Sequence, residues 1–483
     1  MTISMNTIFN KSARLYLLKM IGLLAAFLVN VFLIGELDLS SYGLYVYYIS
    51  ILQITCNLVT GGINGYVSRY FPDRLSIDAN REGSNDTFLL LIFVAKSLFA
   101  ITILILLIKE IELRQLIIVA FIFQVIRIFF EGILKSTLNN EISSKMSLTA
   151  ILVRNGLIVW LLDEINLEIL ITIEICVHAI WVVLFLTLLI TSKVDLHLRF
   201  KRSIKSEISS FELRYLGLSW LNEILNSVTN RSSDIILVRY FTDPHFLGIY
   251  SLALRNYEYI VKILPSKEVL VYVRSYMLAS IKSTDIKFVI KEYQKLFYYV
   301  SLIYMIPVAM FFIVGKLFIR DVYGVQEYDY VYIITCILLV YQLNYALFYH
   351  QSLIVLYLRK IEYSLYTRLI YPIVLLLYVL IESSPSMEAF VVITILCELF
   401  RNFVVSTFLI FKKQNAWNYD MLIGFVGLIV VPSVVGLLLP KASYSQILIS
   451  VLSVLVYIIL YVYFIGYGNV KESMESALGK IFK

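Results

Sequence analysis

Apolar segments long enough to cross a membrane recur along the whole chain. A membrane-spanning helix needs about 20 predominantly apolar residues. Fourteen such segments lie near 13–34, 42–68, 87–108, 115–134, 147–162, 169–190, 215–240, 248–273, 296–315, 331–357, 364–381, 388–411, 419–439 and 447–467. Hydrophobic residues make up 60% of the 483 residues and charged residues only 16%, which is far from the balance of a soluble domain. The pattern predicts an all-α polytopic membrane protein of about 14 helices and excludes a conventional soluble enzyme.

Lys and Arg are distributed unequally between the two sides of this predicted membrane protein. With both termini on one face, that face carries 24 of the basic residues and the opposite face carries five. Basic loops stay in the cytoplasm, so both termini are predicted to be cytoplasmic. The connections on the opposite face are short, which leaves no room there for a catalytic domain.

An internal repeat divides the chain into two lobes. A shift of 205 residues superposes Asp38 on Asp243, Gly43 on Gly248, Tyr45 on Tyr250 and Arg69 on Arg274. A displacement by six spans restores the same orientation, so two parallel six-helix lobes related by a pseudo-two-fold axis are predicted. The predicted divisions are an N-terminal lobe at 1–192, a basic cytoplasmic linker at 193–214, a C-terminal lobe at 215–413, and two extra helices with a cytoplasmic tail at 414–483.

Ionisable side chains inside the predicted spans require an explanation, because a charge in the bilayer is stable only against protein, water or a partner. Spans contain twelve basic residues against seven acidic ones, so a cavity built from their inner faces would suit an anion. Arginine is the better phosphate ligand because its planar fork donates two parallel hydrogen bonds. The predicted substrate-binding residues are Arg127, Arg154, Arg231, Arg255, Lys262 and Arg401.

A purely structural role is the alternative for part of this set. Three pairs have the spacing to neutralise each other within one helix, namely Arg127 with Glu131, Arg255 with Glu258, and Glu398 with Arg401. For these pairs the sequence leaves packing and substrate binding equally open.

Carboxylates in the spans are candidates for binding a coupling ion, H⁺ or Na⁺. Span seven carries Glu223 and Asp234 on one polar helical face, which makes them the first candidates, and Glu174 beside His178 in span six is the second. The alternative is that these groups only hold neighbouring cations in place. No cofactor, metal site or catalytic residue is predicted, because nucleotide, zinc and nucleophile motifs are missing from the sequence.

Three stretches resemble a known family of transporters. They are ELDLSSYGLYVYYISILQ after span one, TNRSSDIILVRYFTDPHFLGIYSLALRNYEYIVKILPS across spans seven and eight, and VGKLFIRDVYGVQEY at 314–328. They resemble the polysaccharide repeat-unit flippases (Wzx type) of the multidrug/oligosaccharidyl-lipid/polysaccharide exporter superfamily. The resemblance covers most of the chain, and Arg239 departs from the small residue that the family usually has there.

The resemblance implies a flippase that carries undecaprenyl-pyrophosphate-linked oligosaccharide repeat units, an O-antigen or capsule precursor, to the outer leaflet of the bacterial inner membrane by alternating access. It also implies contact with membrane lipids, a polysaccharide polymerase and a chain-length regulator as partners, and no nucleic acid. A multidrug or cation antiporter of the same superfamily is the first alternative, although it should present an acidic cavity. A membrane-embedded polysaccharide enzyme is the second.

Overall fold

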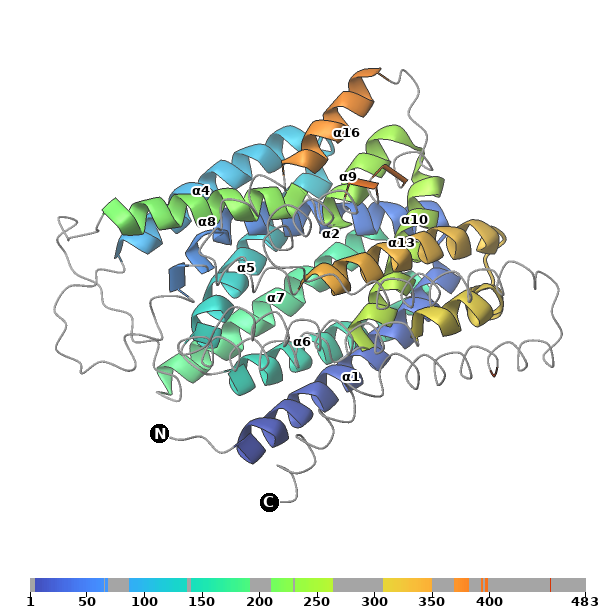
Figure 1. The fold of residues 1–483 in the computed structure, drawn as a ribbon. Coiled ribbons are helices and arrows are strands. Elements are labelled where there is room, and N and C mark those ends of the chain that lie inside the picture. Colours follow the sequence, from blue (N-terminus) through green and yellow to red (C-terminus); the bar gives the residue numbers. More distant parts are fainter. Residues whose placement is uncertain are drawn as a thin grey trace, which may run out of the picture. The chain divides into compact units, whose positions relative to one another are not determined.

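The structure is a computed structural model that describes residues 5–64, 66–67, 87–136, 140–191, 210–228, 231–263, 307–349 and 369–381, with isolated residues at 392–393, 396–397 and 452. Throughout these ranges the regular structure is helical (Figure 1). This confirms the all-α class that the apolar segments predicted.

The first six predicted spans correspond to six helices whose ends lie within eight residues of the ends of the apolar segments. They are α1 (Met5–Glu36), α2 (Leu39–Thr60), α4 (Thr87–Leu107), α5 (Ile111–Ser136), α6 (Asn140–Trp160) and α7 (Leu167–Ile190). All six are long and apolar enough to cross a membrane. Two begin at side-chain caps, where Asp38 accepts from the Ser41 amide at 3.2 Å and Asn166 from the Ile169 amide at 2.9 Å.

Later helices follow the same pattern. Span seven is described as α8 (Ser210–Val228) and α9 (Arg231–Phe241), and α10 (Pro244–Ile263) begins span eight. Beyond these come a helix at 307–323, α13 (Tyr328–Tyr349) and α16 (Ile370–Ile381). The predicted spans at 388–411, 419–439 and 447–467 lie almost wholly outside the described residues, so the count of fourteen stays a prediction.

Two compact units make up the chain, Met1–Ser251 and Leu252–Lys483. Their boundary falls inside α10, whereas most of the predicted linker at 193–214 lies outside the described residues. The predicted lobe boundaries therefore remain predictions.

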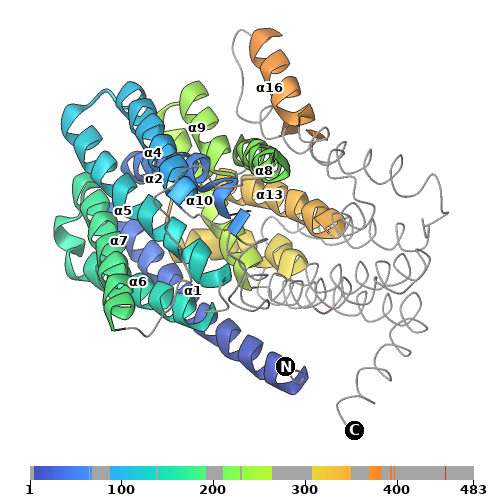
Figure 2. The same cartoon turned by 90° about the vertical axis from the view of Figure 1, so that its left-hand side faces the viewer.

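Within the first unit, α6 packs against α1 and α7, and α5 packs along α7 (Figures 1 and 2). Helix α2 contacts α4, α5 and α7 as well as α8 and α9. The α5–α7 seam is aromatic, with the Phe130 and Phe185 rings 4.6 Å apart and the Trp181 and Phe185 rings 5.7 Å apart. The Phe130–Phe185 pair joins the two helices and stabilises the seam by about 1 kcal/mol beyond its buried area, whereas Trp181 and Phe185 stack within α7.

The polarity of the first unit is that of a protein dissolved in lipid. Large apolar side chains face outward, including Leu106 at 76% exposed and Ile190 at 81%, while Glu174 and Asp234 are buried. The hydroxyls of Ser50 and Thr55 donate to carbonyls of their own helix, which satisfies them without water. Together with the six apolar helices, this arrangement defines a multi-pass membrane protein.

Candidate functional site

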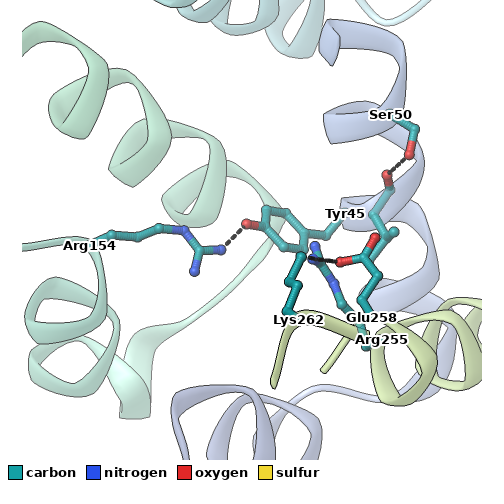
Figure 3. A network of polar contacts seen from close by, with 7 residues as sticks. Tyr45, Ser50, Arg154, Arg255, Glu258 and Lys262 are labelled. Carbon is teal, nitrogen blue, oxygen red and sulfur yellow. Dashed lines mark hydrogen bonds and ion pairs between the residues drawn. The ribbon is translucent and has the colours of Figure 1, made fainter. Parts of the chain in front are cut away.

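A buried polar cluster joins three helices of the first unit. The Arg154 guanidinium on α6 donates to the Glu174 carboxylate on α7 at 2.5 Å. It also donates to the Tyr45 hydroxyl on α2 at 2.5 Å (Figure 3). The Tyr45 hydroxyl in turn donates to Glu174 at 2.7 Å. The three side chains therefore form a closed triangle, in which one carboxylate accepts from both a cation and a phenol.

A second cation extends the cluster along α5. Arg127 donates to Nδ1 of His178 at 3.1 Å and lies 3.7 Å from the Glu131 carboxylate. Because a guanidinium can only donate hydrogen bonds, Nδ1 of His178 accepts and carries no proton. The Arg127 guanidinium also lies over the Trp181 ring, 5.9 Å from its centre.

The charges of this cluster balance. Two arginines face two carboxylates, and all four side chains are largely buried. Breaking one partner from such a buried pair leaves an uncompensated charge and costs about 3–5 kcal/mol. The cluster therefore fixes α2, α5, α6 and α7 relative to one another, and its arginines are already held by protein carboxylates.

Sequence reasoning found part of this arrangement. The Arg127–Glu131 pair has the predicted partners, whereas the partner of Arg154 was missed because it lies on another helix, 20 residues away. The polar face of 174 and 178 on one side of Leu167–Ile190 was the signal that could have pointed to it.

The part of helix α10 that belongs to the second unit carries a different combination of charges. Glu258 accepts from Arg255 at 3.3 Å and from Lys262 at 2.7 Å, as Figure 3 shows for the lysine. One carboxylate is thus shared by two cations, and the Lys262 side chain is 49% exposed. Arg255 and Lys262 are both able to donate charge-assisted hydrogen bonds to an anion.

The structure describes only some of the remaining predicted site residues. Asp234 on α9 is 1% exposed and accepts from the Tyr250 hydroxyl at 3.3 Å. Glu223 on α8 packs its stem against Gly61. Arg231 begins α9, although its side chain is not described, and Arg401 lies outside the described residues. Substrate or ion binding by any of these residues stays a prediction.

Among the described residues, no group of three or more His, Cys, Asp and Glu could hold a metal ion.

Comparison with known proteins identifies solved structures with a similar fold. No protein-family model and no curated protein matches the sequence. Several solved structures are similar, and two of them match most of the chain. One, described only as protein A, has a TM-score of 0.56 at 14% identity and covers 84% of this chain and 96% of its own.

The other solved structure is the lipid II flippase MurJ in an inward closed conformation. Its TM-score is 0.59 at 14% identity, and the match covers 93% of this chain and 99% of MurJ. At this identity the likeness concerns the fold alone. The chain is therefore a multi-pass helical membrane protein with a MurJ-like fold.

Proposed function

We propose that this protein is a flippase that moves polyprenyl-pyrophosphate-linked oligosaccharide from the cytoplasmic to the outer leaflet of the bacterial inner membrane by alternating access. The observation that carries the proposal is the similarity of the fold to a lipid II flippase over 93% of the chain. The resemblance of residues 229–266 to polysaccharide flippases favours an O-antigen or capsule repeat unit as the glycan. A polymerase and a chain-length regulator are the partners that would use such a product.

The Arg255–Glu258–Lys262 trio is the best-supported position for the pyrophosphate. Arg255 and Lys262 both contact Glu258, so two cations lie close enough together to contact one phosphate, and the Lys262 side chain is half exposed. Arg255 can present two parallel donors to phosphate oxygens, and Lys262 adds a mobile point charge. By contrast, the two arginines of the Arg154 cluster are matched by two carboxylates. We therefore rank Arg255 and Lys262 above Arg127 and Arg154 as substrate contacts.

A cation antiporter is the main competing function. A cation carrier needs a carboxylate that is free to exchange partners. In the described part of the chain, Glu131, Glu174 and Glu258 are each ion-paired. Asp234, which is buried and accepts a hydrogen bond from the Tyr250 hydroxyl, and Glu223 stay our first candidates for binding H⁺ or Na⁺ if export is ion-coupled.

Ligand binding distinguishes these functions. Purified full-length protein in detergent would be titrated with undecaprenyl pyrophosphate, undecaprenyl phosphate and ethidium, and binding would be followed by the shift of the thermal unfolding midpoint. We expect the pyrophosphate to bind tightest, and the Arg255→Ala/Lys262→Ala variant to lose at least about tenfold in affinity, since each charge-assisted hydrogen bond contributes about 1.5–3 kcal/mol. Arg320→Ala, on a half-exposed surface, is the matched control. Preferential binding of ethidium would contradict the proposal.

A further inference from the structure

The C-terminal end of α2 is capped by two side chains from other helices. The last carbonyls of a helix lack partners within it, and in a membrane such groups must be satisfied by protein. Lys96 of α4 donates to the Gly61 carbonyl at 2.9 Å, and the Trp220 indole of α8 donates to the Leu58 carbonyl at 3.0 Å. The Lys96 ammonium also lies 5.0 Å from the centre of the Trp220 ring, a cation–π distance.

Two glycines allow α8 to approach this end closely. Gly62 has a φ of +77°, which side-chain-bearing residues rarely adopt. A Cβ at Gly62 would lie 2.9 Å from the Leu216 carbonyl oxygen and 3.0 Å from Cβ of Trp220. A Cβ at Gly61 would lie 2.9 Å from Cβ of Glu223. The end of α2 and the face of α8 therefore fit only because these two positions lack side chains.

The opposite end of α2 also contacts the second repeat. A Cβ built on Gly43 would lie 2.6 Å from the backbone nitrogen of Gly248 on α10. Gly43 and Gly61 are 18 residues apart along one helix, or roughly 27 Å at 1.5 Å per residue, close to the thickness of a bilayer core. Helix α2 is thus joined to second-repeat helices at both faces of the membrane.

We propose that Trp220 and Lys96 form a latch, the α2 latch, which closes the transport path at the membrane face where α2 ends. This proposal rests on alternating access in the proposed function, because a carrier opens at one face while it stays closed at the other. The α2 latch releases when the path opens at that face, while the Gly43–Gly248 contact stays closed at the other. Release exposes the α8 surface that the latch covers.

Ser227 is a reporter of that release. It is 2% exposed and lies seven residues beyond Trp220 on α8. Leu216, Trp220, Glu223 and Ser227 follow helical spacing, so Ser227 lies on the face that meets α2. In a full-length background with the four cysteines replaced by Ala, the reaction of Ser227→Cys with a water-soluble maleimide would be timed in nanodiscs. Its rate follows the population of the open form.

The variants separate the parts of the latch. Trp220→Phe removes the indole donor and keeps a ring, and Lys96→Met removes the charge and keeps the stem. We expect each to raise the labelling rate about fivefold, as for the loss of one hydrogen bond, and Trp220→Ala to raise it further. The matched controls are Trp160→Ala, whose ring is 77% exposed, and Lys109→Met in an external turn; both should leave the rate unchanged.

A second reporter detects general loosening. Ala120 on α5 is fully buried among the helices of the first unit. The labelling of Ala120→Cys should therefore stay slow in every variant. An equal rise at both reporters, or no rise at Ser227→Cys, would contradict the latch. No transport substrate is needed, so the outcome is separable from the proposed function: labelling that rises without flipping activity would leave the latch standing and overturn the substrate.

Discussion

Gly43 on α2 and Gly248 on α10 lie in backbone contact, although 205 residues separate them in the sequence. The contact is reciprocal: a Cβ at Gly43 would meet Pro244 and Gly248, and a Cβ at Gly248 would meet Leu39. The same offset relates Leu39 to Pro244 and Asp38 to Asp243, and both aspartates cap the start of their helix. A two-fold axis produces such self-complementary contacts, so this is the kind of contact that the predicted pseudo-two-fold relation of the repeats would give.

Replacement of either glycine by alanine tests this contact. Gly43→Ala and Gly248→Ala each force a methyl group against backbone, so we expect a loss of about 1–3 kcal/mol in stability, read as a lower thermal unfolding midpoint in detergent. Gly35→Ala is the matched control, because no described atom lies within 4 Å of its Cβ; there the better helix propensity of alanine should be neutral or stabilising by up to about 1 kcal/mol. Equal midpoints for all three variants would contradict the close contact.

The Arg154–Glu174 pair should behave as a structural element. Arg154→Met or Glu174→Gln alone leaves a buried charge without its partner and should lower stability by about 3–5 kcal/mol. The double variant should recover much of this loss, because neither charge remains. Tyr45→Phe keeps the ion pair and should cost about 1–3 kcal/mol. Thermal unfolding of the four variants measures this, and additive losses in the double variant would rule out direct pairing.

Asp38 gives the first cap a pH dependence. The hydrogen bond from the Ser41 side chain is the main cause that lowers the pKa of Asp38 below its ordinary value of 3.8. Because the folded-state pKa is the lower one, the stabilisation is fully present above pH 3.8 and is lost as the pH falls through the folded-state value. Asp38→Ala should cost about 1 kcal/mol at pH 7, and the difference from wild type should shrink below pH 3.8. Asp38→Asn caps without titrating, so the difference in stability between Asp38→Asn and Asp38→Ala should stay constant over the same pH range.

Hydropathy was sufficient to place the first six helices, because lipid imposes a length of about 20 apolar residues on each span. The ends of α4 and α7 agree with the predicted segments to within two residues. The offset of 205 residues likewise identified Gly43 and Gly248 as equivalent, although it could not show that they touch.

Contacts between helices were less accessible to sequence reasoning. Arg154 was recognised as a charge in a span, but its partner Glu174 depends on how α6 packs against α7, which spacing along one helix does not encode. Trp220 and Lys96 were missed because their contacts with the end of α2 depend on how α4 and α8 pack against it, which spacing along one helix does not encode. The signal that could have identified them was the Gly61–Gly62 pair directly after an apolar helix, a sequence typical of a helix end that packs closely.

Sidedness remains a prediction that cysteine labelling can settle. In cysteine-free intact cells, Asp163→Cys, exposed in the turn between α6 and α7, should react with a membrane-impermeant maleimide. Ser203→Cys in the basic stretch should react only after permeabilisation, because 24 basic residues are predicted on that face. Labelling of Ser203→Cys in intact cells would reverse the orientation.

Flipping by the purified protein in liposomes tests the central claim most directly. The measurement follows a fluorescent undecaprenyl-pyrophosphate-linked sugar under an imposed potential and without ion gradients. Two negative charges crossing about 100 mV gain on the order of 4–5 kcal/mol, so we predict flipping above that of empty liposomes, faster with the potential that favours outward movement, and at least about tenfold slower in Arg255→Ala/Lys262→Ala. Flipping that appears only with a proton or sodium gradient would transfer the driving role to carboxylates such as Asp234. Flipping at the level of empty liposomes under every condition, with export of ethidium, would contradict the account.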